Sequence, residues 1–214
     1  MKTILNRKLL DWTAVKNRCR RTMGKDATDK EPSDKFRRTL LISEHSPIRL
    51  IEFDWSWKNI PYWVSTEWSR HKFEKFISSQ RDDRVSSDTP RGEKPQDAPV
   101  SFDGYANMQN LIDAWRKRLC RNATREAREL AEDFKITLMA DADAWEEGRV
   151  LVPHCVYRCG CPEPKTCGWW NGFLNWAECN APWPREVWMS DIEKRYHIYN
   201  MWFTKHTTQG RCEK

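Results

Sequence analysis

The residues with the clearest chemical potential lie in one segment, PYWVSTEWSRHKFEKFISSQRDDR, which spans residues 61–84. It places Arg70, His71 and Lys72 among aromatic residues and then becomes a polar run with hardly an apolar side chain. Cations at the C-terminal end of a helix are favoured by the backbone dipole, so this cluster has an explanation that needs no ligand. A cationic cluster beside aromatic rings can also hold a phosphate or a nucleotide.

The element that would carry this cluster is a helix. Pro61 suits the first turn of a helix, because its missing N–H has no partner there. Apolar residues then return at roughly helical spacing as far as Phe76 or Ile77. We therefore expect an apolar helix that delivers the cationic cluster to the start of a loop.

The composition fits a single domain with a sizeable core, because the chain has 214 residues. The formal net charge of +6 permits an anionic partner such as a phosphate, a nucleotide or a nucleic acid. Thirteen tryptophans can be explained as core residues, and several could instead serve flat ligands or subunit contacts.

The sequence shows no N-terminal apolar segment of the signal-peptide kind and no apolar run of about 18 residues. We therefore expect a cytoplasmic protein that is neither secreted nor inserted in a membrane. In that compartment its eight cysteines favour free thiols or metal ligands over disulfides.

Several further elements follow from periodicity. The pattern predicts helices over residues 9–23 and 33–43, the second capped by Ser33 or Asp34. Alternation in residues 48–57 puts three aromatic side chains on one side and predicts a half-buried antiparallel strand, with a turn at Lys58-Asn59. Residues 78–99 are too polar to bury themselves and predict a partly mobile surface loop.

The clearest helix in the sequence spans residues 107–134. Its apolar residues recur every three or four positions, while Arg116, Lys117 and Arg121 are expected to face away. Near residue 148 another helix is expected to end, with Gly148 as its stop, and residues 186–203 predict a last amphipathic helix.

A cysteine-rich stretch follows residue 150. Soft thiolates at short spacing on a Gly- and Pro-rich loop can close a tetrahedral zinc site, so Cys155, Cys159, Cys161 and Cys167 are candidate ligands. The alternative is that these are reduced thiols packed among tryptophans.

The order of these segments resembles the flavin-dependent thymidylate synthases, the ThyX family. Residues 70–72 with Ser79 resemble its Arg-His-Arg…Ser signature, and the segment at His45 resembles its Gly-His-x-Ser/Thr segment. The long helix resembles the family's Asn-x-Arg-x-Leu…Ala-Gln-x-Glu-Ile-Arg helix, with matches at Asn107, Leu111, Arg118, Ala123, Glu126 and Arg128.

The resemblance implies an α+β fold in which long helices flank an antiparallel sheet. Residues 1–150 would form the ThyX-like catalytic domain, with a mobile loop at about residues 78–100. Residues 151–214 would form an irregular Cys- and Trp-rich extension packed on that domain.

The resemblance also implies a methyltransferase of dTMP biosynthesis. In this family a homotetramer binds FAD, dUMP, methylenetetrahydrofolate and NADPH, and reduced FAD supplies the hydride that accompanies one-carbon transfer to C5 of dUMP. Arg118 would be the catalytic residue, because it would hold the uracil ring and stabilise the charge that develops there. The implied substrate contacts are Glu67, Arg70, Ser79, Gln80, Arg81 and Arg118, and the implied cofactor contacts are His45, Arg70, His71, Lys72 and Asn107.

The chain departs from the family pattern at three positions. Glu67 replaces a glutamine, Lys72 replaces an arginine, and Asp83 stands where the family has a second serine. Two alternatives therefore remain open. One is a flavin-dependent pyrimidine-modifying enzyme with another product, such as a hydroxymethylated base. The other is a non-catalytic nucleic-acid-binding protein with a zinc clip.

Overall fold

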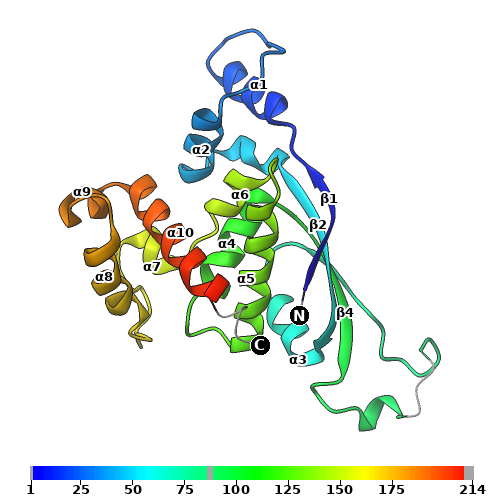
Figure 1. The fold of residues 1–214 in the computed structure, drawn as a ribbon. Coiled ribbons are helices and arrows are strands. Elements are labelled where there is room, and N and C mark those ends of the chain that lie inside the picture. The colour runs from blue at the N-terminus through cyan, green and yellow to red at the C-terminus, as the bar shows by residue number, and fades with distance from the viewer. Residues whose placement is uncertain (1, 86–88, 210–214) are drawn as a thin grey trace.

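A four-stranded antiparallel sheet forms one layer of the protein (Figure 1). The computed structural model describes residues 2–85 and 89–209. The strands occur in the order β1-β2-β4-β3 across the sheet. Their bounds are β1 Thr3–Leu9, β2 Glu52–Pro61, β3 Glu74–Ile77 and β4 Pro99–Asn107.

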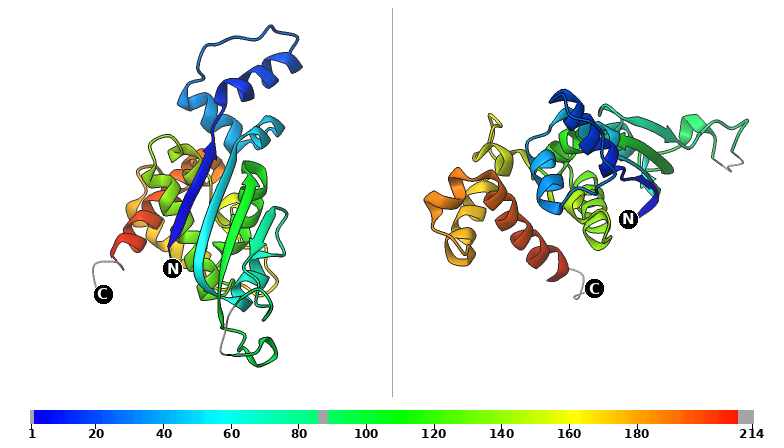
Figure 2. Two further views of the ribbon diagram at one scale, coloured as in Figure 1. Left: turned by 90° about the vertical axis from the view of Figure 1, so that its right-hand side faces the viewer. Right: turned by 90° about the horizontal axis from the view of Figure 1, so that it is seen from above.

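Helices α4 (Met108–Arg118), α5 (Arg125–Ala140) and α6 (Trp145–Arg149) cover one face of this sheet (Figures 1 and 2). Helices α7 (His154–Arg158), α8 (Trp169–Asn180), α9 (Arg185–Ser190) and α10 (Ile192–Gln209) lie beyond them. At one end of the sheet, α1 (Trp12–Thr22) and α2 (Asp34–Ile42) form a projecting arm. The expected α+β class is therefore confirmed.

Three short elements complete the chain. The 3-10 helix η1 (Ser46–Leu50) precedes β2, helix α3 (Tyr62–Trp68) follows β2, and η2 (Arg91–Glu93) lies in the loop before β4. Two local predictions are confirmed at this level. Ser33 caps α2, because its hydroxyl accepts a hydrogen bond from the Phe36 N–H, and β2 buries Phe53, Trp55 and Trp57.

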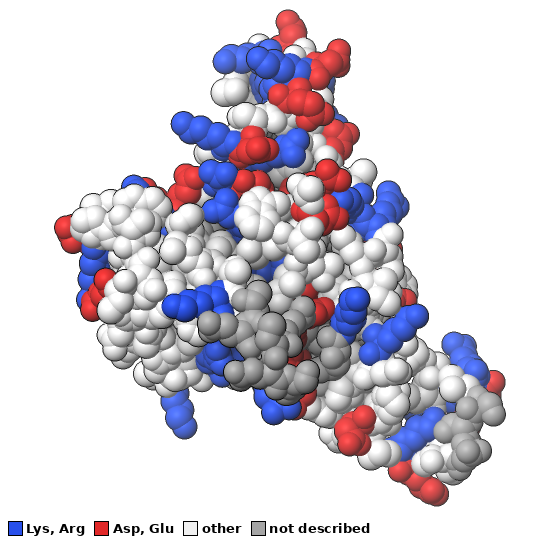
Figure 3. All heavy atoms as spheres, in the orientation of Figure 1, with Lys and Arg blue, Asp and Glu red and all other residues white. Residues whose placement is uncertain are grey.

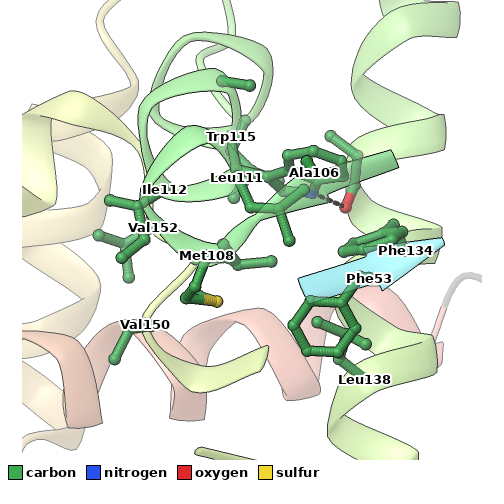
Figure 4. Packing of buried hydrophobic residues seen from close by; sticks show 14 of the residues in the cluster. Phe53, Ala106, Met108, Leu111, Ile112, Trp115, Phe134, Leu138, Val150 and Val152 are labelled. Carbon is green, nitrogen blue, oxygen red and sulfur yellow. Dashed lines mark hydrogen bonds between the residues drawn. The ribbon is translucent and has the colours of Figure 1, made fainter. Parts of the chain in front are cut away.

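The main core lies between the sheet and helices α4 and α5 (Figure 4). Phe134 of α5 lies against Phe53 and Trp55 of β2, with ring centroids 6.4 and 5.1 Å apart. Trp115 of α4 packs on Phe134 at 4.4 Å and donates its indole N–H to the Ala131 carbonyl. The helical stripe that the sequence predicts for residues 107–134 is therefore the stripe that faces the sheet.

The predicted helix over residues 61–77 is wrong in its second half. Helix α3 ends at Trp68, and residues 74–77 form β3, which pairs with β4. Phe76 and Ile77 are compatible with either a helical or an alternating pattern, and the free edge of β4 decides between them. Arg70, His71 and Lys72 consequently lie in the turn between a helix and a strand.

The predicted helix over residues 107–134 is two helices. Asn107 ends β4 and caps α4, and residues 119–124 separate α4 from α5. Arg116 also differs from expectation, because its side chain is only 7% exposed and pairs with Glu44. Its guanidinium lies 3.6 Å from the ring centroid of Tyr157, so it joins α4 to α7.

Three smaller expectations are wrong. Gly148 lies within α6, where a Cβ would come within 2.9 Å of the Met139 side chain on α5. The expected last helix is divided at Asp191 into α9 and α10. The predicted turn at Lys58-Asn59 is an irregularity inside β2, with Asn59 at a φ of 56°.

The polar run from Ser78 to Ala98 is a surface loop that contains only η2, as its composition predicts; residues 86–88 lie outside the described residues. Among the described helices, none is long and apolar enough to cross a membrane.

One glycine in β4 can test this packing. Gly104 pairs with Trp55 across the sheet, and a Cβ at this position would collide with the Trp55 indole ring. We expect Gly104→Ala to lower the free energy of unfolding by about 1–3 kcal/mol, as overpacked core substitutions do. Urea denaturation measures this change.

Gly172→Ala is the matched control, because no heavy atom lies within 4 Å of a Cβ there and the residue is inside α8. This variant should be stabilised by up to about 1 kcal/mol through helix propensity. An unchanged stability of Gly104→Ala would contradict the close contact with Trp55.

Candidate active site

Arg118 is the centre of a hydrogen-bonded cluster at the C-terminal end of α4. Its Nε donates to His71 Nε2 at 2.7 Å, one terminal nitrogen donates to Glu67 Oε2 at 2.9 Å, and the other donates to the Glu67 carbonyl at 2.6 Å. The side chains of Arg118 and Glu67 are only 14% and 20% exposed. Guanidinium carries five N–H donors, so these three bonds leave two for another partner.

His71 is neutral in this cluster. Burial lowers its pKa to about 4, and the nearby positive charges of Arg118 and Lys75 act in the same direction. Its Nε2 accepts the hydrogen bond from Arg118, so the ring proton resides on Nδ1. His71 therefore leaves one N–H donor beside the charged guanidinium.

Burial also acts on Arg118 itself. It lowers the arginine pKa, which the Glu67 carboxylate counteracts and the Arg70 charge reinforces. Because a guanidinium keeps its proton throughout the physiological range, Arg118 is a permanent cation in a partly desolvated setting. Such a charge acts more strongly on a bound ligand than a charge in water does.

The core fixes the position of this cluster. Trp68, the last residue of α3, is fully buried and packs on Trp115 of α4 with centroids 4.9 Å apart. The Arg118 guanidinium lies 5.8 Å from the Trp68 ring centroid, and the His71 ring lies 5.6 Å from it. The turn after α3 is held as well, because the Lys75 ammonium donates to the His71 carbonyl.

Arg70 and Lys72 flank His71 in a different setting. Both residues are exposed, and within the described part of the chain neither forms an ion pair. They therefore present two cations to solvent beside a neutral, half-buried histidine. Lysine and arginine can both hold phosphate oxygens, although lysine lacks the two-pronged geometry of arginine.

Ser79 and Gln80 lie further along, after β3. They line a hollow of about 410 Å³ together with Lys94 and several loop residues. Arg81 is paired with Asp83 through two hydrogen bonds of 2.8 and 2.6 Å, so its charge is compensated locally.

Asn107 lies away from Arg118, and His45 is not part of the hydrogen-bonded cluster around Arg118. Asn107 caps α4 by accepting from the Asn110 N–H at 3.0 Å, at the opposite end of that helix from Arg118. A helix of 11 residues is roughly 16 Å long. His45 is exposed and joins α2 to η1. A single chain therefore does not gather all of the residues that the sequence suggests for the site.

The cysteines do not form the zinc site that the sequence suggests. Among the described residues, no three His, Cys, Asp or Glu side chains are placed to hold a metal ion. Cys159 is directed elsewhere, since its sulfur contacts the Met189 carbonyl at 3.4 Å. Cys155 is buried, and burial raises its thiol pKa to about 12.

One member of the cluster was not anticipated from the sequence: Thr124 donates to Glu67 Oε2 at 3.0 Å. Trp68, one of the aromatic residues that the sequence places beside the cations, lies under Arg118. A threonine before a helix is typical of a cap, and Thr124 lies at that position without capping α5. Its role depends on α3, which is distant in sequence, so no local pattern could have indicated it.

The neutral state of His71 makes stability depend on pH. The unfolded chain binds a proton near the ordinary histidine pKa of 6.5, whereas folded His71 does so only near 4. The unfolded state therefore binds more protons in this window, and the free energy of unfolding falls as the pH drops from about 6.5 to 4. His71→Gln should make this fall less steep.

Urea denaturation at several pH values measures this difference. His154 and His197 should retain their share in the variant, because burial lowers their pKa values too. Identical slopes for His71→Gln and the parent would exclude a neutral His71.

Comparisons with known proteins were made by sequence and by structure. No family model matches the sequence, and no curated protein matches it. Solved structures do match. A structure of thymidylate synthase X from Helicobacter pylori with FAD and dUMP has a TM-score of 0.59 and 12% identity. The match covers 71% of this chain and 99% of that one.

A second structure of the Helicobacter pylori flavin-dependent thymidylate synthase, also complexed with FAD and dUMP, has a TM-score of 0.53 and 14% identity. That match covers 69% of this chain and 98% of the other. The element order and the antiparallel sheet agree with what the sequence motifs implied. The chain therefore has the fold of the flavin-dependent thymidylate synthase ThyX, in a highly divergent sequence.

Proposed function

We propose that this protein is a flavin-dependent thymidylate synthase-like enzyme. It transfers a one-carbon group from methylenetetrahydrofolate to C5 of dUMP, with FAD reduced by NADPH. The observation that carries this proposal is the cluster of Glu67, His71 and Arg118, on a ThyX fold, beside two exposed cations that form no ion pair with any described residue.

Arg118 is the residue that would act on the pyrimidine. Its two remaining N–H groups can donate to a uracil carbonyl while the other three keep the guanidinium in place. As C5 becomes nucleophilic, negative charge develops on the ring and its carbonyl oxygens. A fixed cation at that position lowers the barrier, because it needs no reorganisation during the reaction.

The residues after α3 fit the phosphates of a flavin dinucleotide. Arg70 and Lys72 are exposed cations without ion pairs among the described residues, and the neutral His71 offers an N–H. The two positive charges of Arg70 and Lys72 would be balanced by the negative charges of a bound pyrophosphate. When bound, FAD supplies the hydride that completes the methyl group.

The remaining candidate residues suggest a site shared between copies. Asn107 lies at the opposite end of α4 from Arg118, and His45 is outside the Arg118 cluster, so a neighbouring copy could bring them to that cluster. We propose a homotetramer in which the arm and the N-terminal end of α4 approach the Arg70–Lys72 turn of another subunit.

Glu67 favours a second candidate, a pyrimidine-modifying enzyme with an altered substrate or product. Its carboxylate accepts from Arg118 and from Thr124, and therefore brings negative charge to the place where the nucleotide would bind. A carboxylate and a guanidinium side by side present an acceptor and a donor to the edge of the base. That combination differs from the neutral glutamine of the family.

Visible absorption spectroscopy tests the proposed function. We expect the purified protein to show flavin bands, or to gain them when FAD is added, and we expect these bands to shift when dUMP is added. Arg70→Ala should weaken FAD binding by about tenfold or more, since it removes one phosphate contact.

Arg185→Ala is the control for this experiment, because Arg185 is exposed on α9 and pairs with Glu178. It should bind FAD like the parent protein. If the protein binds neither FAD nor dUMP under these conditions, the proposed function is wrong.

Glu67→Gln tests the effect of the carboxylate on the nucleotide. The variant restores the neutral side chain of the family and removes the ion pair that occupies Arg118. We expect the affinity for dUMP to rise by about tenfold, which corresponds to roughly 1.4 kcal/mol. Calorimetric titration of the FAD-loaded protein with dUMP measures this change, and a fall in affinity would show that Glu67 supports binding.

A further inference from the structure

A second hollow lies between α6 and the C-terminal end of α5 on one side and α10 on the other. Its volume is about 570 Å³, which is within the range of small-molecule sites. Met139 lines it near the end of α5, whereas Thr124 of the Arg118 cluster precedes that helix. At 1.5 Å per residue the 16 residues of α5 span about 24 Å, so the hollow is separate from the proposed active site.

The lining of this hollow is positively charged. Arg149 and Lys205 supply two cations, His197 adds an imidazole ring, and no carboxylate lines the hollow. Among the described residues Lys205 forms no ion pair, and Arg149 has one, a long contact of 3.9 Å to Glu146. Glu146 is already held by Arg38 through hydrogen bonds of 2.6 and 3.0 Å. The charge of Arg149 is therefore largely uncompensated.

Neighbouring groups respond to this charge. Burial lowers the pKa of His197, and Arg149 and Arg38 lower it further. Burial also lowers the pKa of Lys135 well below its ordinary value, with Arg149 again acting in the same direction. Burial is the main cause of both shifts, and the positive charge of Arg149 adds to each.

The hollow also has a flat aromatic wall. The Trp145 side chain is 42% exposed, and the Arg149 guanidinium lies 5.7 Å from its ring centroid. Arg149 is held from behind, because Asn200 donates to its carbonyl at 3.0 Å while accepting from the buried Lys135 at 2.7 Å. The backbone that carries Arg149 is therefore held by α10.

The hollow on the projecting arm lacks this combination. It has a volume of about 450 Å³ and is lined by three cations, but Asp26 also lines it and no aromatic residue does. Basic and acidic side chains are intermixed over α1 and α2 (Figure 3). Of these two hollows, only the one between α6 and α10 combines largely uncompensated cations with an exposed aromatic ring.

We propose that the α6–α10 hollow binds a nucleotide, with the base stacked on Trp145 and the phosphate between Arg149 and Lys205. The exposed indole supplies the surface that a planar ring needs, and the two cations supply the charge that a phosphate needs. A free mononucleotide and the 5′-phosphorylated end of a single strand share this chemistry. This site is independent of the proposed thymidylate synthase reaction.

Calorimetric titration of the full-length protein with AMP tests the proposal. Arg149→Gln and Lys205→Gln should each weaken AMP binding by about tenfold, since each removes a charge-assisted contact to phosphate. Trp145→Leu should weaken AMP binding while leaving the binding of inorganic phosphate unchanged. Lys205 is exposed, so its variant tests the site without a risk to folding.

Two controls separate this site from others. Lys165→Gln removes an exposed lysine between α7 and α8, outside the hollow, and should bind AMP like the parent. Arg118→Ala should retain AMP binding, which distinguishes this site from the proposed active site. A 5′-phosphorylated trinucleotide that binds more tightly than AMP would identify a strand end as the source, and equal binding would identify a free nucleotide.

AMP binding that survives all three pocket substitutions would overturn the proposal, as would no measurable binding at millimolar AMP. Inorganic phosphate binding as tightly as AMP would overturn the role of Trp145.

Discussion

The contact between the Trp55 ring and the backbone of Gly104 is the constraint on which the rest of the structure depends. Trp55 is fully buried in β2, and the absent side chain of Gly104 makes room for it. The ring then reaches Phe73 beside β3, Trp115 on α4 and Phe134 on α5, with centroids 5.3, 5.9 and 5.1 Å away. One side chain thus sets the spacing between the sheet and both covering helices.

The packing of these aromatic rings also fixes the geometry of the candidate site. Trp57 lies beside Trp55 and packs on Trp68, which in turn contacts Trp115. Trp68 ends α3, and its ring places Arg118 and His71 within reach of each other. A continuous aromatic core therefore ends at a permanent cation, where the low local polarity strengthens the charge. The large number of tryptophans in this chain is thereby explained mainly by packing.

The sequence predicts the helices of this fold better than its strands. The apolar stripe of α4 and α5 is visible because a helix buries a face that its own residues define. In contrast, β3 has four residues and exists only because β4 offers a free edge, so local alternation could not reveal it. The break at residues 119–124 was missed because the apolar spacing continues across it.

The candidate site was likewise only partly predictable from the sequence. Arg118 and His71 were identified through short motifs, and the structure brings these two together. Glu67 accepts hydrogen bonds from Arg118 through both its carboxylate and its backbone carbonyl. This contact depends on the angle between α3 and α4, and the spacing of residues along the sequence does not reveal that angle. The burial of Arg116 depends likewise on Tyr157, which lies in a different part of the chain.

Arg116 also governs where this chain can be shortened. Its guanidinium pairs with Glu44 near α2, covers Tyr157 of α7 and lies near the Tyr196 hydroxyl of α10. The segment that connects α6 to α7 is almost completely buried at Val150, Leu151 and Val152. A truncated version ending near residue 150 would leave a charged pair without its aromatic cover and an apolar face open to water. Crystallisation or engineering of a minimal unit should therefore keep α7 and α10 attached.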